Sequence, residues 1–259
     1  MSRRYKIVLA FDGTAYAGYQ LQDNAATVQQ RLEEVLAYLD RRPVRVFGSS
    51  RTDAGVHAHG FCCHFDLDKP IPAANLVRAM NSRLPDDIRV LKASRVRDDF
   101  DARKDALGKE YRYFLYNADI LPPHLAPYWA FQHRPLDIAA MQAAAAHFTG
   151  RHDFTSFAAN PRRDISSTVR TIFSFTVTRR GPRIVFAVRG DGFLYKQVRS
   201  MVGFLIRVGR GEERPETVAD LLARHPARTA RVPTATGRGL FLWKVFYGRR
   251  GTHLQTVRR

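Results

Sequence analysis

The sequence predicts a mixed α/β protein built from two β-α-β-β-α-β halves with largely antiparallel sheets. The chain has 259 residues, which suits one large or two small domains. Its composition, 45% hydrophobic and 11% aromatic, is that of a globular protein. Short strand-like runs alternate with segments of helical periodicity, and the second half repeats the order of the first, which is the pattern of split β-α-β units.

The first half starts with a strand over 5–11. Thr27 and Gln30 form a capping box, and the apolar residues that follow recur at helical spacing, so we expect an amphipathic helix over about 28–40. The half then continues as strand, strand, helix and strand, at 44–47, 60–67, 73–84 and 87–92. The second of these helices stops before Pro85, because proline disfavours helical geometry in the residue before it.

The second half starts with a strand over 109–117, in which aromatic residues alternate. Asp137 can cap the N-terminus of a helix, with Leu136 and Met141 placed as its hydrophobic staple. A hairpin, a long apolar helix and a closing strand follow, at 169–178 with 183–189, at 193–208 and at 240–247.

The halves meet in a charged stretch at 97–108, so we expect domains at 1–103 and 104–259. The first domain carries Asp53, and the second carries Tyr111 and Arg199.

The chain is strongly basic, with 42 Lys and Arg against 24 Asp and Glu and a net charge of +18. Folding does not require this excess, because like charges repel in the compact state. A polyanionic partner offsets it, and nucleic acid is the usual one. The alternative is a genome that favours arginine codons.

The two cysteines, Cys62 and Cys63, are neighbours in a strand-like run and point to opposite faces, so we expect no disulfide and a reducing cytoplasm. His57, His59 and His64 lie nearby but lack the spacing of a zinc site, and we expect no metal. The N-terminal apolar run is too short for a signal peptide, and no window is long enough for a membrane span.

Asp53 lies in a short polar loop, residues 50–58, between two strand-like runs. Arg51 precedes it by two residues, and a guanidinium favours the ionised carboxylate, which suits a nucleophile or an electrostatic stabiliser. Gly55 follows by two residues, so the same sequence also fits an ordinary turn in which Asp caps backbone amides and Gly supplies a positive φ.

Arg199 lies on the predicted 193–208 helix, in one row with Tyr195, Val202 and Ile206. An arginine within an apolar row either pairs with a carboxylate or packs its aliphatic stem and extends its charged group into water. The residues of the helix leave both possibilities open.

Tyr111 and Tyr113 point to the same side of their strand. They either pack in the core or offer a ring that stacks on an extruded base. The 11–14 segment has the sequence of a turn, and we assign no chemistry to His152 and Asp153.

Arg51–Ala58 closely resembles the catalytic loop of the tRNA pseudouridine synthase A family, and the likeness extends over about residues 5–247. Further similar segments follow in the family's order: 11–14, 18–20, 27–29, 84–88, 109–113, 152–154, 192–195 with 198–199, and 239–240. Several matches in order are far more specific than one short motif. Ser50, Tyr19 and Gln197 depart from the family's usual Gly, Trp and Met, and none of them removes a charge.

The resemblance implies a pseudouridine-synthase-like fold with a basic active cleft between the halves, no cofactor, and a homodimer that holds one tRNA across both subunits. The implied reaction isomerises uridine in the anticodon stem-loop, at tRNA positions 38–40. Asp53 is then the essential carboxylate, Arg199 its partner, and Tyr111 stacks on the uracil ring. Arg51 holds a phosphate or the flipped nucleotide. A non-catalytic RNA-binding protein and a phosphodiester hydrolase remain as alternatives.

Overall fold

The computed structural model describes residues 2–159, 167–224 and 227–248. These residues form five α-helices and ten β-strands, which agrees with the predicted mixed α/β class. The chain divides into two compact units: Met1–Leu107 with the segment from Phe241 onward, and Gly108–Leu240. Each unit is described by itself.

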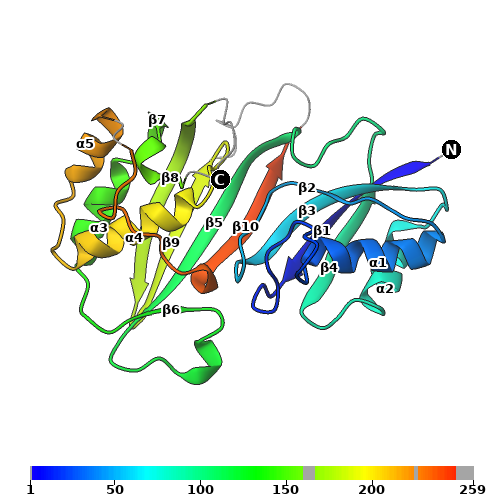
Figure 1. Ribbon diagram of the computed structural model, residues 1–259, viewed down its shortest axis with the longest axis horizontal. Helices are drawn as coiled ribbons and strands as arrows, with labels where there is room; N and C mark the ends of the chain where they lie inside the picture. Colours follow the sequence, from blue (N-terminus) through cyan, green and yellow to red (C-terminus); the bar gives the residue numbers. More distant parts are fainter. Residues whose placement is uncertain (1, 160–166, 225–226, 249–259) are drawn as a thin grey trace. The chain divides into compact units, whose positions relative to one another are not determined.

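The first unit follows the predicted order β-α-β-β-α-β (Figure 1). Its elements are β1 (Arg3–Phe11), α1 (Val28–Asp40), β2 (Phe47–Gly48), β3 (His57–Leu67), α2 (Ala73–Asn81) and β4 (Ile88–Arg95). Strand β1 pairs antiparallel with β3 on one side and β4 on the other. The closing strand β10 (Leu240–Tyr247) runs parallel to β3, with Phe241 opposite His57.

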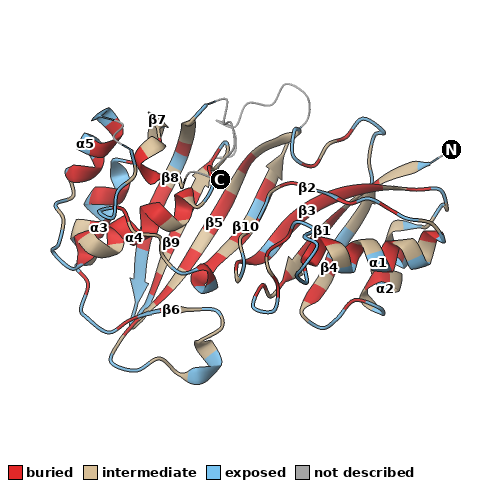
Figure 2. Ribbon diagram, viewed as in Figure 1, coloured by how far each residue is buried: buried red, intermediate tan, exposed pale blue. Residues whose placement is uncertain are grey.

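Helix α1 forms as its sequence predicts. The Thr27 hydroxyl accepts a hydrogen bond from the Gln30 amide at 3.3 Å, and the apolar face of the helix buries Leu32 and Leu36. Strand β1 alternates buried and partly exposed residues, whereas β3 is buried along nearly its whole length (Figure 2). The core of the first unit therefore lies between the sheet and its helices.

The second unit is also largely antiparallel, with strand order β5-β9-β8-β7 and β6 parallel to β5. Its strands are β5 (Ala106–Asn117), β6 (Ala130–Gln132), β7 (Gly150–Asp153), β8 (Val169–Arg180) and β9 (Arg183–Gly190). Its helices are α3 (Ile138–Ala146), α4 (Gln197–Gly209) and α5 (Thr217–Arg224). Short 3-10 turns lie at Pro123–Leu125, Thr155–Phe157 and Gly237–Gly239.

Two local predictions for the second unit are confirmed. The Asp137 carboxylate accepts a hydrogen bond from the Ala140 amide at 3.0 Å, so it caps α3. Strands β8 and β9 form the predicted hairpin, closed by Gly181 with a φ of 55°. Strands β6 and β7 and helix α5 were not predicted, because three- and four-residue strands and an eight-residue helix carry too little periodicity.

The long apolar helix starts later than predicted, at Gln197 rather than residue 193. Lys196 has a left-handed φ of 58°, and the Gln197 side chain accepts a hydrogen bond from the Leu194 amide, so the chain turns before the helix begins. Tyr195 is therefore outside α4 and 43% exposed, and it does not share a helix face with Arg199.

Other bounds also differ from prediction. The strand expected at 44–47 is reduced to Phe47 and Gly48, and β4 extends to Arg95. Helix α2 ends at Asn81, and a turn in which the Leu84 amide bonds Met80 O follows it.

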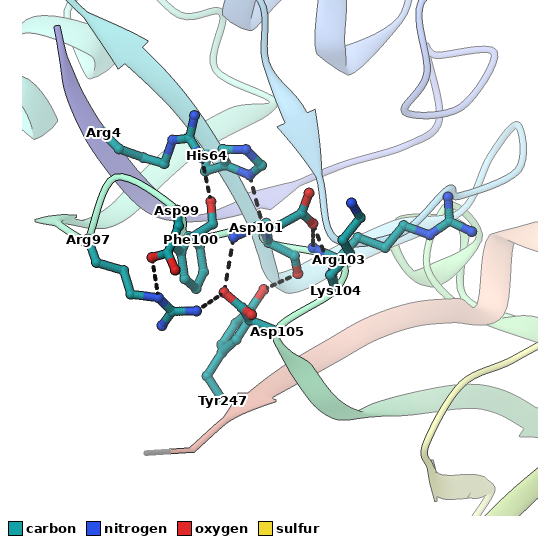
Figure 3. Close-up of polar contacts among 11 residues, drawn as sticks. Arg4, His64, Arg97, Asp99, Phe100, Asp101, Arg103, Lys104, Asp105 and Tyr247 are labelled. Atoms are coloured by element: carbon teal, nitrogen blue, oxygen red, sulfur yellow. Dashed lines mark hydrogen bonds and ion pairs between the residues drawn. The ribbon is translucent and has the colours of Figure 1, made fainter. Parts of the chain in front are cut away.

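Residues 97–105, which are most of the charged stretch at 97–108 expected as a domain boundary, form an ordered polar cluster of the first unit (Figure 3). Arg97 pairs with both Asp99 and Asp105, and the Asp101 carboxylate accepts the Arg103 and Lys104 amides. The units thus divide close to this stretch, but β10 from Phe241 onward lies with the first unit instead of the second, and its Phe241 and Leu242 pair with residues of β3.

No helix among the described residues is long and apolar enough to cross a membrane. In the same ranges no three His, Cys, Asp or Glu side chains gather in a way that could hold a metal ion. Cys62 and Cys63 are buried and free, and burial raises the pKa of the Cys62 thiol to about 11.

Candidate active site

Asp53 lies half-buried in a tight turn between β2 and β3. The Val56 amide donates a hydrogen bond to Asp53 O at 3.1 Å, and Gly55 has a left-handed φ of 70°. The predicted turn is therefore present. Its backbone hydrogen bond is independent of the Asp53 side chain, and Arg51, on the same loop, is exposed.

A second loop, residues 12–19 between β1 and α1, supports this turn along its length. The Tyr19 amide donates to Thr52 O at 3.3 Å, and the Gly55 amide donates to Tyr16 O at 3.4 Å. Gly18 has a φ of 108°, and a Cβ atom there would lie 2.4 Å from Thr52 O. Only glycine combines this backbone conformation with such a close approach.

The start of the same second loop contacts the end of the Asp53 turn. A Cβ atom on Gly13 would lie 2.1 Å from Val56 O, so the two backbones are in direct contact. The Gly13 amide donates to His57 Nδ1 at 3.0 Å in a buried environment. Asp12 accepts bonds from the Thr14 amide and hydroxyl, which confirms that 11–14 is a turn.

Arg199 is half-buried on α4 in the second unit. Its Nε donates to Ala235 O at 2.7 Å, and the Ala235 amide donates to Arg199 O at 3.0 Å. Arg228 binds the same loop through Val232 O, and its pKa is lowered by burial and by the neighbouring charge of Arg199. The two guanidinium groups therefore concentrate positive charge at this end of α4.

Tyr111 and Tyr113 lie on one side of β5, as predicted, and both are buried. Tyr113 is 1% exposed, and burial raises the pKa of its hydroxyl while the charges of Arg199 and Arg238 oppose that rise. It is a core residue near Arg199. Tyr111 is 6% exposed, and its ring meets the edge of Phe193 at 5.1 Å between centroids.

The departures from the family pattern at Tyr19 and Gln197 fit the core. Tyr19 is buried and stacks on Phe61 with centroids 4.2 Å apart. Gln197 is buried, caps the Leu194 amide and directs its Nε2 toward Met201 Sδ at 3.7 Å. Both side chains pack in the core of their own unit.

The pair His152 and Asp153 has the contacts of a turn. Asp153 accepts bonds from the Thr155 amide and hydroxyl, and a His152 ring nitrogen lies 3.0 Å from Thr149 O. Sequence reasoning missed the contact of Gly13 with His57 and the Ala235 loop on Arg199, because both join residues far apart in the chain.

Two surface hollows of the second unit contain none of the predicted site residues. One, of about 430 Å³, lies beside α5 and mixes acidic and basic side chains. The other, of about 650 Å³, lies on β5, β8 and β9 and is basic and aromatic, with Arg112, Arg183, Tyr116 and Trp129 in its lining.

A family model described as tRNA pseudouridine synthase matches residues 7–104 and 144–248. The chain belongs to the tRNA pseudouridine synthase family. Asp53 and Arg199 lie inside the matched stretches, whereas Tyr111 lies between them.

Curated relatives extend the match over almost the whole chain. A protein of Exiguobacterium sibiricum named tRNA pseudouridine synthase A is 43% identical over 95% of this chain and 97% of its own length. One of the same name from Solibacter usitatus is 45% identical over 95% of this chain and 100% of its own length. The similarity therefore includes both units.

Proposed function

We infer that this protein is a tRNA pseudouridine synthase that isomerises uridine in the anticodon stem-loop, at tRNA positions 38–40. This conclusion rests on the family membership of nearly the whole chain. It also rests on a family-type Asp53 loop that backbone hydrogen bonds hold in place. A rigid loop that presents one carboxylate is a suitable scaffold for a reaction at a single nucleotide.

The reaction rearranges the nucleoside without adding any group. The N1–C1′ bond of uridine breaks, the base turns, and C5 bonds to C1′. The base must leave its stack to reach a carboxylate, which costs a few kcal/mol and is cheapest in a loop or at a loop-closing pair. The C5 proton leaves and N1 gains one, so composition and redox state are unchanged.

We assign the chemistry to side chains of both units. Asp53 is the essential carboxylate, and Arg199 orients it and favours its ionised form. Tyr111 stacks on the uracil ring, and Arg51 holds a phosphate or the flipped nucleotide. Support comes from the exposure of Arg51, the half-burial of Asp53 and Arg199, and the positive charge that Arg228 adds beside Arg199.

The remaining parts of the proposal concern the RNA. A basic cleft between the halves binds the tRNA backbone, and the net charge of +18 is consistent with many phosphate contacts. The protein acts as a homodimer, with one tRNA lying across both subunits. Phosphate contacts of this kind are sensitive to salt, because each displaces counterions from the RNA.

The test uses unmodified tRNA labelled with tritium at C5 of uridine, incubated with the protein and a metal chelator. Bond formation at C5 releases tritium to water while the RNA remains full length. Tritium release that requires uridine at positions 38–40 supports the proposal. Binding without release indicates the non-catalytic RNA-binding alternative, and shortened RNA indicates a hydrolase.

A further inference from the structure

His57 is a fully buried polar residue at the end of the Asp53 turn, and the roles assigned above do not use it. It is the first residue of β3, four positions after Asp53, and its exposed fraction is 0%. Its ring stacks on Phe241 with centroids 4.6 Å apart and planes inclined by 19°. A polar ring fixed so firmly has its hydrogen-bonding direction set by the fold.

A hydrogen bond from Gly13 fixes the tautomer of the His57 ring. Gly13 N–H donates to His57 Nδ1 at 3.0 Å, so Nδ1 carries a lone pair and the ring proton sits on Nε2. Asp12 Oδ1 also lies 3.1 Å from Nδ1, but that oxygen already accepts the amide and hydroxyl of Thr14. Protonation of Nδ1 would deprive the buried Gly13 amide of this acceptor, which is costly.

The Gly13 contact continues to Asp53 through the backbone. Gly13 lies against Val56 O, and the Val56 amide closes the turn on Asp53 O. At the other end of the turn, Tyr19 holds Thr52 O. Asp53 is thus held on both sides by the loop of residues 12–19, and the His57 bond fastens the start of that loop to the end of the turn.

We propose that His57 is a positioning residue for Asp53, acting as a neutral acceptor whose Nδ1 holds Gly13 and thereby sets the backbone of the catalytic turn. This rests on the proposed function of Asp53. Displacement of a reacting group by about 1 Å costs on the order of a hundredfold in rate, so loss of this bond changes the chemical step and not tRNA binding.

His64 on the same strand provides a matched control. It is 4% exposed, and its Nδ1 accepts the Ala102 amide at 3.0 Å, which is the same kind of bond that His57 makes (Figure 3). Burial lowers the pKa of His64, which favours the neutral form of this ring. It holds the 97–105 cluster instead of the Asp53 turn, about 23 Å farther along the strand.

The experiment compares His57→Leu and His57→Asn with His64→Leu and His64→Asn, using the full chain and a range of tRNA concentrations that reaches saturation. We expect His57→Leu to lower kcat ten- to a hundredfold with KM nearly unchanged. His57→Asn should recover much of kcat, because the asparagine Oδ1 can take the place of Nδ1 as an acceptor. Both His64 variants should lose stability like their His57 counterparts but keep kcat within about threefold of wild type.

Equal kcat losses in the His57 and His64 leucine variants would overturn the proposal. A kcat for His57→Asn that is no higher than the kcat for His57→Leu would overturn it as well. If His57→Leu does not fold, ¹⁵N NMR of histidine-labelled wild type decides: an unprotonated Nδ1 on His57 at neutral pH supports it, and a protonated Nδ1 refutes it. This readout needs no activity. An inactive wild type would therefore count against the proposed function, while the NMR result still tests the tautomer.

Discussion

The Asp53 turn and the Arg199 helix end fix their charged residues by different means. The turn is held by backbone atoms of residues 12–19, with glycines at the closest approaches. Arg199 is held through its own guanidinium, whose Nε binds Ala235 O. A substitution of Asp53 therefore leaves its support intact, whereas a substitution of Arg199 removes a charge and a structural hydrogen bond together.

The largest effect is expected at Asp53. Asp53→Asn keeps the shape of the side chain and removes its charge, so tritium release from tRNA should become undetectable. Thermal stability and tRNA affinity should stay close to wild type, because the turn is closed by backbone bonds and affinity comes mostly from phosphate contacts. Activity within about tenfold of wild type would exclude Asp53 as the essential carboxylate.

Arg199→Met should reduce turnover by several orders of magnitude and also lower the free energy of unfolding by about 1–2 kcal/mol, because Ala235 O loses its donor. Arg228→Met is the matched control, since Arg228 holds the same loop at Val232 O. It should lose similar stability and much less turnover. Chemical denaturation and single-turnover rates separate the two roles.

The double variant of Asp53 and Arg199 sharpens this point. Groups that act as a unit are non-additive, so any residual turnover that a long incubation detects for Asp53→Asn should fall little further when Arg199→Met is added. A full multiplicative loss would mean that Arg199 acts separately from Asp53.

Two glycine-to-alanine substitutions test how closely the 12–19 loop constrains the Asp53 turn. Gly18→Ala should destabilise the protein by about 2 kcal/mol or more, because it combines a positive φ with a Cβ atom 2.4 Å from Thr52 O. Gly55→Ala has a positive φ but open space around its Cβ, so it should cost only about 1 kcal/mol. Equal losses of unfolding free energy would show that the 12–19 loop does not constrain the turn.

Substitution of Tyr111 is expected to have the smallest effect on turnover, because its ring carries no charge and contributes to tRNA binding. Tyr111→Ala should weaken tRNA affinity by about 1–3 kcal/mol, the value of one base–aromatic stack. Tyr111→Phe should bind normally. Because the ring is only 6% exposed, an alternative outcome is informative: lost stability with unchanged affinity would place Tyr111 in the core beside Tyr113.

Much of the secondary structure was predictable because its causes are local. The Thr27 and Asp137 caps each bond an amide three residues ahead, and the β8–β9 hairpin is closed by a two-residue turn. The start of α4 was missed because a left-handed Lys196 and a glutamine side-chain cap are unusual ways to begin a helix.

The sequence alone determined the identity of the Asp53 loop, the family and the order of the elements in the first unit, because motifs and periodicity are carried by neighbouring residues. Only the tertiary structure decided that β10 pairs with β3, that residues 12–19 frame Asp53, and that His57 receives the Gly13 amide. These contacts join residues dozens to nearly two hundred positions apart. Their geometry depends on how whole strands are registered, and local sequence patterns contain no record of that register.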